Sequence, residues 1–262
     1  MIDNRDEYAR MYEVERSLWW YKTLHGRIVD QIRKHFGTNT RDLSVLDAAC
    51  GTGGLLSFLR ERGFTQLAGF DYSRHAIDFS VTRQLDVSFG DLRNVDQYRP
   101  GTSYDVIICN DALYFLTDEE IVRVLAEFKA RLRPNGLLLI NIHAFNAFAG
   151  THDLAVGSTR RFVLPDFEKY TRASGLYLSY STYWPFFLSL PIWAIRQWQR
   201  FQLRQNPVSA SEIKSDVQYP GDLINATLHA VTRAEQWLLP RAPFGSSLFL
   251  VMKDTKTTGS FP

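Results

Sequence analysis

A glycine-rich turn between a short apolar run and an amphipathic segment constrains the fold of this chain most strongly. The stretch VLDAACGTGG covers residues 45–54. Ser44–Ala49 predicts a buried strand, and Gly54–Arg62 predicts a helix that ends at Gly63. Glycine lets a ligand approach the backbone because it has no Cβ. A helix start adds free N–H groups and a positive dipole end. The turn therefore indicates a site for a dinucleotide pyrophosphate or for an adenosyl amino acid.

Strands and helices alternate along the first half of the chain. Further strands are predicted at 66–70, 85–89, 104–109 and 137–142, and helices at 6–36, 75–83 and 118–132, the last ending at Asn135–Gly136. This rhythm indicates an α/β fold with a parallel, doubly wound, Rossmann-like sheet. It breaks after residue 150, where Leu176–Tyr183 and Ser247–Lys253 predict two more strands.

Acidic residues near the turn favour the adenosyl amino acid. The dinucleotide fingerprint requires a third glycine where this chain has Leu56. The carboxylate of Asp47 suits a ligand with a cationic ammonium or sulfonium group. Asp71 ends the second strand, where an acidic residue can bind both ribose hydroxyls. Asp91 follows the third strand and can accept a hydrogen bond from an adenine amino group, while Leu92 packs on the ring.

Together these motifs resemble those of the class I S-adenosylmethionine-dependent methyltransferases. VLDAACGTGG resembles the first motif of the family, GFDYS the second and GDL the third, and CNDALYFLTD and LRPNGLLLI resemble the segments around the fourth and fifth strands. The resemblance covers about residues 40–145 and implies seven strands in the order 3-2-1-4-5-7-6, the seventh antiparallel. It implies S-adenosylmethionine as cofactor, bound by Asp47, Ala49, Gly51, Gly53, Asp71, Tyr72, Asp91, Leu92, Asn110 and Trp20.

Two further segments resemble a bacterial methyltransferase subgroup of the type 11-like kind. MYEVERSLWWYKTLHGRI is similar to its aromatic leader, although the paired arginines of that leader are missing here. HAFNAFAGTHDLAVGSTRRF is similar to a second stretch, in which relatives carry Pro at the position of His143 and His at that of Ser158. For Trp19, Trp20 and Tyr21 of the leader, two interpretations stay open: core packing of a helix, or a lid over the cofactor.

Candidate catalytic residues follow the fourth and fifth strands, since ligands of such sheets bind beyond the carboxyl ends of the strands. His143 and His152 are the candidate general bases because histidine titrates near neutrality. Tyr114 is a third candidate and stands where many relatives carry His. The alternative for either histidine is a hydrogen-bonded structural role. For Asp153 with Arg160 or Arg161, a structural ion pair is favoured.

The chain is expected to form one domain, residues 1–254, with a disordered tail at 255–262. An N-terminal helical cap covers 1–40, and a helical insertion, 184–245, separates the sixth and seventh strands. Within it Arg196, Arg200 and Arg204 recur at helical spacing, and no acidic residue occurs from Trp184 to Ser211. Three interpretations stay open: a helix with a solvated basic edge, a cap over an apolar acceptor, or, least favoured, a helix in a membrane interface.

The expected function is methyl transfer to a small, partly apolar acceptor at oxygen, nitrogen or carbon. The alternative is an S-adenosylmethionine-binding fold used for a cyclisation or rearrangement, or as a non-catalytic binding module. A net charge of +2 without a basic tract predicts no nucleic-acid partner. Scattered His and Cys residues predict no metal. Two cysteines and an N-terminus without an apolar segment predict a cytoplasmic location. The oligomeric state is not predicted.

Overall fold

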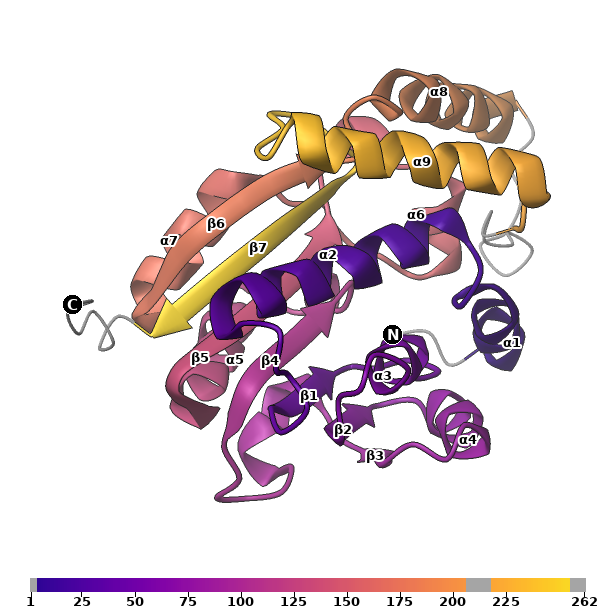
Figure 1. Cartoon of the computed structure of the whole chain (residues 1–262). Coiled ribbons are helices and arrows are strands. Elements are labelled where there is room, and N and C mark those ends of the chain that lie inside the picture. The colour runs from indigo at the N-terminus through magenta and orange to yellow at the C-terminus, as the bar shows by residue number, and fades with distance from the viewer. Residues whose placement is uncertain (1–3, 206–217, 255–262) are drawn as a thin grey trace.

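A computed structural model describes residues 4–205 and 218–254 (Figure 1). The expected tail and parts of the cap and the insertion lie outside these residues. Seven strands form one sheet in the order β3-β2-β1-β4-β5-β7-β6, and β7 runs antiparallel to both of its neighbours. The predicted order is therefore confirmed. The strands are β1 (Ser44–Ala48), β2 (Gln66–Asp71), β3 (Val87–Phe89), β4 (Tyr104–Asn110), β5 (Leu132–His143), β6 (Leu176–Trp184) and β7 (Ser247–Asp254).

Helices cover both faces of the sheet because the central strands are apolar on both sides. Along β4, Val106 and Ile108 join a core with α2 (Trp19–Phe36) and α3 (Gly54–Arg60). Ile107 and Cys109 point the other way, into a core with α5 (Asp118–Arg131) and α7 (Leu164–Ser174). The other elements before β6 are α1 (Arg5–Val14), α4 (Arg74–Thr82), α6 (Thr151–Ala155) and the 3₁₀ helices η1 (Leu92–Gln97), η2 (Leu113–Phe115) and η3 (Asn146–Phe148).

Some boundaries differ from the sequence-based expectation. The helix expected at 6–36 is two helices, α1 and α2, separated by a short turn at residues 15–18. Strand β5 begins at Leu132, directly after α5, because Leu132 pairs with Tyr104 before the ladder resumes at Leu137. Asn135–Gly136 thus lies within β5 and does not end the helix. Helix α7 was not expected, although Pro165 in its first turn and Gly175 as its C-cap mark its ends.

The carboxyl ends of the strands bring the predicted site residues to one edge of the sheet. Asp47 is the second-last residue of β1, and Asp71, Asn110 and His143 are the last residues of β2, β4 and β5. Strands β1 and β4 are hydrogen-bonded neighbours, while the chain runs outward from β1 to β2 and β3. Ligands of doubly wound sheets bind beside such a switch in strand order.

The segment between β6 and β7 contains two long helices, α8 (Ser189–Gln205) and α9 (Asp222–Leu238). Helix α9 packs on α2, a helix from the other end of the chain (Figure 1). Asn225 accepts a hydrogen bond from the Trp19 N–H (2.7 Å) and donates one to the Ser17 carbonyl (3.0 Å). These bonds attach the insertion to the start of α2. None of the helices in the described part of the chain is long and apolar enough to cross a membrane.

Candidate functional site

A cavity of about 410 Å³ lies at the carboxyl ends of the strands. Residues that follow β1, β2, β4 and β5 line it, together with α1, α2 and two side chains of α8, Ile192 and Arg196. All the predicted site residues except Gly53 contribute to its wall: Trp20, Asp47, Ala49, Gly51, Asp71, Tyr72, Asp91, Leu92, Asn110, Tyr114, His143 and His152. The fold therefore gathers in one cavity the residues that the sequence pointed to separately.

Glycine is needed at different positions of the turn for different structural reasons. Gly51 lies in the cavity wall with a φ of +55°. Gly53 has a φ of +80°, and a Cβ there would lie 2.3 Å from Leu85 Cδ1. Packing against the segment before β3 thus explains Gly53 without any ligand. A Cβ on Gly54 would lie 2.3 Å from the carboxyl carbon of Glu15. Gly54 is therefore required for the close approach of the leader to the turn.

Asp71 organises the turn after β1. Its carboxylate accepts the Gly51 N–H (2.9 Å) through one oxygen and the Ser73 N–H (2.9 Å) through the other. Burial raises the pKa of Asp71, and these backbone hydrogen bonds partly oppose the rise. Each oxygen keeps a further lone pair for a ligand in the cavity.

Asp47 is a buried carboxyl group without a hydrogen-bond donor among the described residues. Burial, and then the charges of Asp71 and Glu15, raise the pKa of Asp47 well above its ordinary value. Such a group is stabilised by a cation placed beside it in the cavity. The ammonium and sulfonium charges of S-adenosylmethionine fit this requirement. The negative pyrophosphate of a dinucleotide does not, because Asp47 would repel it.

Asp91 and Leu92 form the next part of the wall. Asp91 accepts the Arg93 N–H (2.9 Å) and thereby caps η1, and Leu92 is buried beside it. The carbonyl oxygen of the Asn110 side chain is buried without a hydrogen-bond partner in the described residues. It can accept a hydrogen bond from a ligand group.

The aromatic leader closes one side of the cavity. Tyr8 and Met11 of α1 and Trp19 and Tyr21 of α2 are part of the wall. Trp20 also lines the cavity and stacks on Trp184, with ring centroids 5.4 Å apart. Both interpretations of the leader therefore keep support, since its side chains pack on the core and also border the ligand space.

Glu15 anchors this leader to the domain. Its carboxylate accepts hydrogen bonds from the Thr52 hydroxyl and the Arg83 guanidinium, all three side chains being buried or nearly so. Arg83 also donates to the carbonyls of Thr52 (3.1 Å) and Tyr12 (2.9 Å). The sequence analysis did not identify this pair, because Glu15 lay inside the single helix predicted at 6–36 and Arg83 lies far away in the chain.

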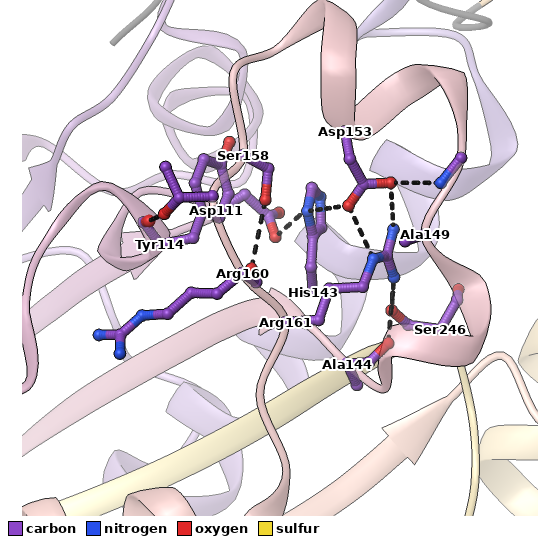
Figure 2. A network of polar contacts seen from close by, with 12 residues as sticks. Asp111, Tyr114, His143, Ala144, Ala149, Asp153, Ser158, Arg160, Arg161 and Ser246 are labelled. Carbon is purple, nitrogen blue, oxygen red and sulfur yellow. Dashed lines mark hydrogen bonds and ion pairs between the residues drawn. The ribbon is translucent and has the colours of Figure 1, made fainter. Parts of the chain in front are cut away.

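His143 lies between two carboxyl groups (Figure 2). Its Nε2 is 3.7 Å from Asp111 Oδ1, and its Nδ1 is 3.9 Å from Asp153 Oδ1. Arg161 binds Asp153 through two hydrogen bonds, of 2.7 and 3.0 Å, and also donates to the Ala144 carbonyl (3.0 Å). The favoured ion pair is thus formed by Arg161, whereas Arg160 pairs with Asp118.

Burial is the main reason why His143 stays neutral. Burial, and then the charge of Arg161, lower the pKa of His143 well below its ordinary value. For Asp153, burial alone would raise the pKa, but the hydrogen bonds and charge of Arg161 outweigh burial and hold the pKa below its ordinary value. An ionised Asp153 therefore faces one nitrogen of a neutral imidazole.

Asp111 differs from Asp153 in its electrostatic state. Burial raises the pKa of Asp111 to about 7, although the hydrogen bond from Asn141 Nδ2 (2.9 Å) and the charge of Arg161 oppose the rise. Its backbone has a φ of +48°, and its N–H donates to the Asn141 carbonyl (2.8 Å). The unusual backbone conformation places the Asp111 carboxyl group beside His143. This carboxyl group therefore gains or loses its proton near neutral pH.

Tyr114 and His152 complete the cluster. The Tyr114 ring stacks on His143 with centroids 5.0 Å apart, and burial raises the pKa of Tyr114 well above its ordinary value. The ring of His152, on α6, meets His143 edge-on at 5.5 Å. The structure thus brings all three catalytic candidates into contact.

Asn141 is the functional residue that the sequence analysis missed. It binds Asp111 and also accepts a hydrogen bond from the Trp184 indole N–H (2.9 Å). A polar residue in the apolar run LLLINIH was the available signal. Among residues 4–205 and 218–254, no three His, Cys, Asp or Glu side chains cluster in a way that could hold a metal ion.

Comparisons with known proteins agree with this geometry. Residues 20–180 match the family model described as a methyltransferase domain. A dTDP-4-amino-2,3,4,6-tetradeoxy-D-glucose N,N-dimethyltransferase from Saccharopolyspora spinosa is 28% identical over 142 residues, which are 53% of each chain. The chain spans between 53% and 63% of the length of the first curated relatives that it matches.

Solved structures share the fold. An S-adenosylmethionine-dependent methyltransferase from Clostridium acetobutylicum is 13% identical, with a TM-score of 0.54 and coverage of 89% of this chain and 91% of that one. The [4+2]-cyclase SpnF is 15% identical, also with a TM-score of 0.54, over 87% of this chain and 80% of that one. With the domain match over more than half of its length, the chain belongs to the methyltransferase-domain family, and its fold is that of the class I S-adenosylmethionine-dependent methyltransferases.

Proposed function

We propose that the protein transfers the methyl group of S-adenosylmethionine to a small, partly apolar molecule. The observation that carries this proposal is one cavity with two chemically different ends. Acidic and glycine positions suited to the cofactor lie after β1 and β2, and the ionisable cluster of Figure 2 lies after β4 and β5. The relative from Saccharopolyspora spinosa is named as a dimethyltransferase of a dTDP-linked amino sugar, which is a small molecule as well.

The cofactor end would work through charge and shape. Asp47 would attract the ammonium and sulfonium charges, Asp71 would accept hydrogen bonds from the ribose hydroxyls, and Asp91 would accept one from the adenine amino group. The other proposed contacts are with Trp20, Ala49, Gly51, Tyr72, Leu92 and Asn110, and Gly53 is omitted because it does not line the cavity. When bound, the cofactor supplies a methyl group activated by a positively charged sulfur.

The cluster around His143 would remove a proton from the acceptor. A neutral imidazole can take the proton of a hydroxyl or an amine as the methyl group is transferred. Asp111, whose pKa is about 7, lies close enough to share that proton, and Asp153 would stabilise the positive imidazole that forms. Tyr114 would fix the ring by stacking. His152 is the second candidate base.

Apolar side chains suggest what the acceptor looks like. Trp19, Tyr21, Leu24 and Phe115 border the cavity, and Ile192 of α8 adds an aliphatic contact. An acceptor with a large apolar part and one ionisable group would match this wall. In this proposal α8 serves as the cap over the acceptor, through Ile192 and Arg196.

Labelled cofactor tests the proposal directly. The protein is incubated with S-adenosylmethionine that carries a radioactive methyl group and with a panel of phenols, amines and amino sugars that bear apolar substituents. Label in the acceptor fraction supports methyl transfer. A product that forms without label supports the alternative, in which the fold performs a cyclisation or rearrangement, and cofactor binding without any product would leave a binding module.

His143 carries the assignment of the base. With an active acceptor, His143→Asn should lower kcat by about 10²–10⁴ and leave the cofactor affinity within a few fold. His152→Asn is the matched comparison, since His152 lies in the same cavity wall. If both variants keep full activity, alignment of the acceptor with the methyl group would have to explain the rate without a base.

A further inference from the structure

Helix α8 is attached to the domain through its polar side. Gln197 donates a hydrogen bond to the Ala147 carbonyl (3.0 Å), and Arg200 donates one to the Ala149 carbonyl (2.8 Å). Arg196 lies so close to Gly150 that a Cβ there would be 2.5 Å from Arg196 Cδ. Arg196 and Arg200 are therefore half-buried against the domain, whereas Arg204 is exposed.

The opposite side of α8 is apolar and faces outward. Leu190 is 76% exposed and Trp198 is 60% exposed. The other large exposed apolar side chains of this side are Ile195 and Phe201, while Trp193, 44% exposed, lies one turn before Arg196 and Gln197, next to the polar side. A helix on the surface of a soluble domain normally buries its apolar stripe and exposes its polar one. Helix α8 does the reverse.

Helix α9 shows the same inversion. Its buried residues are polar: Asn225, Thr232 and Glu235. Asn225 binds the start of α2, Thr232 bonds to Thr23 (2.8 Å), and Glu235 accepts the Phe187 N–H (2.8 Å). Outward it presents Leu223, 82% exposed, and Trp237, 81% exposed, with Ile224 and Leu238. Figure 1 shows both helices at the same end of the molecule.

We propose that this outward apolar surface, formed by Leu190, Ile195, Trp198 and Phe201 of α8 with Leu223, Ile224, Trp237 and Leu238 of α9, binds the surface of an anionic phospholipid bilayer. Large apolar side chains gathered in this way on a protein surface usually mark a binding surface, because contact with water is unfavourable for them. Two helices, not the single one considered from the sequence, supply it.

The chemistry of the surface favours a bilayer as its occupant. Two of its eight side chains are tryptophans, whose amphipathic rings suit the boundary between acyl chains and headgroups. Helix α8 has no acidic residue, and two of its three arginines, Arg196 and Arg200, contact the domain. Arg204, at its C-terminal end, is exposed and can approach anionic headgroups. The surface thus combines apolar area with positive charge at its edge.

The position of the cavity gives this surface a role in the proposed function. Ile192 and Arg196 line the cavity from the same helix that presents Trp198 outward. An acceptor dissolved in the bilayer would therefore reach the cavity beside α8. This step rests on the proposed methyl transfer, and it identifies the acceptor class as lipophilic molecules that partition into membranes.

Vesicle flotation tests the surface without cofactor or acceptor. The full chain is mixed with vesicles of phosphatidylcholine, alone or with phosphatidylglycerol, and the bound fraction is measured. We expect binding that increases with phosphatidylglycerol and a blue shift of the tryptophan fluorescence. W198Q/W237Q should lower the partition coefficient by about tenfold or more. The control is V81Q/Y177Q, which changes two exposed apolar side chains, 57% and 58% exposed, on α4 and β6, outside the proposed surface.

Two outcomes would overturn the proposal. One is a wild-type protein that binds neither kind of vesicle. The other is a dimer, measured by light scattering, that W198Q/W237Q dissociates and vesicles do not, because a second copy would then cover the surface. Failure of methyl transfer would appear in the labelling experiment and not in flotation, so the two proposals can fail separately.

Discussion

At the scale of single residues, Asp71 tests the cofactor end of the cavity. Its carboxylate holds the Gly51 and Ser73 N–H groups and faces the ligand space. We expect Asp71→Ala to lower the affinity for S-adenosylmethionine by about tenfold or more, measured by calorimetry, because a hydrogen bond to a charged group is lost. Two unpaired N–H groups should also lower the free energy of unfolding by roughly 1–3 kcal/mol.

The control for this change is Asp78→Ala, which removes an exposed carboxyl group from the nearby helix α4. It should alter neither quantity. An Asp71→Ala variant that folds and keeps the wild-type affinity would refute the role of Asp71 in ribose binding.

Asp111 gives a prediction about pH. Its pKa is about 7 in the folded protein against an ordinary value of 3.8. The folded state binds this proton more tightly, so the stability it contributes is complete below about pH 4 and is lost as the pH rises through 7. Asp111→Asn has no such proton. We therefore expect the variant to gain stability relative to wild type between pH 4 and 7, by up to about 2–4 kcal/mol, and no further change above pH 8.

Urea denaturation at several pH values measures this difference. His143 titrates in the opposite sense because its folded pKa is lowered, but it is present in both proteins and largely cancels. Tyr114 and Arg161 also act on Asp111 and are likewise unchanged. A gap between the two stabilities that does not vary with pH would contradict the raised pKa of Asp111.

At the scale of elements, α2 depends on a cap supplied from α9. Its N-cap residue, Leu18, has no side chain that can bind the first N–H groups. Asn225 accepts the Trp19 N–H instead and donates to the Ser17 carbonyl. We expect Asn225→Ala to lower the free energy of unfolding by about 1–3 kcal/mol and to speed hydrogen exchange in the first turn of α2.

Thr227→Ala provides the comparison, since Thr227 is exposed on the same helix and bonds only to the Leu223 carbonyl within it. Its effect on stability should stay within about 0.5 kcal/mol. Equal effects of the two substitutions would show that Asn225 does not act as the cap of α2.

At the scale of the whole molecule, the sequence predicts the sheet better than the surface. Apolar runs such as DVIIC and LLLI predict buried strands, and acidic residues at strand ends predict the cofactor side of the site, because both follow from local patterns. The contacts of Asn141, Glu15 and Asn225 could not be predicted, since their partners lie far away in the chain. The orientation of α8 was also not predictable, because the carbonyls that bind Arg200 lie in another segment.

The leader and the glycine turn meet at one wall of the cavity. Glu15 binds Arg83 and Thr52 directly over Gly54, and the leader residues Met11 and Trp19 form part of the cavity wall. A Cβ at position 54 would overlap the Glu15 carboxyl group, so Gly54→Ala must move the Glu15 side chain, which attaches the leader to the domain, and we expect the leader to shift with it. Helix propensity cannot explain a weaker binding of cofactor by Gly54→Ala, since Gly54 begins α3 and alanine favours helices.

Thermal unfolding with and without cofactor measures this coupling. At a concentration of about 100 times its dissociation constant, the cofactor adds about 2.7 kcal/mol to the free energy of unfolding. This should raise the Tm of a chain of this size by roughly 5–10 °C. Gly54→Ala should show a clearly smaller rise because the wall contributed by Met11 and Trp19 is displaced. Gly26→Ala, whose Cβ would meet only Arg233 at an ordinary 3.6 Å, should keep the full rise. If Gly54→Ala also keeps it, the leader packs on the domain without contributing to cofactor binding, and its aromatic residues serve the core alone.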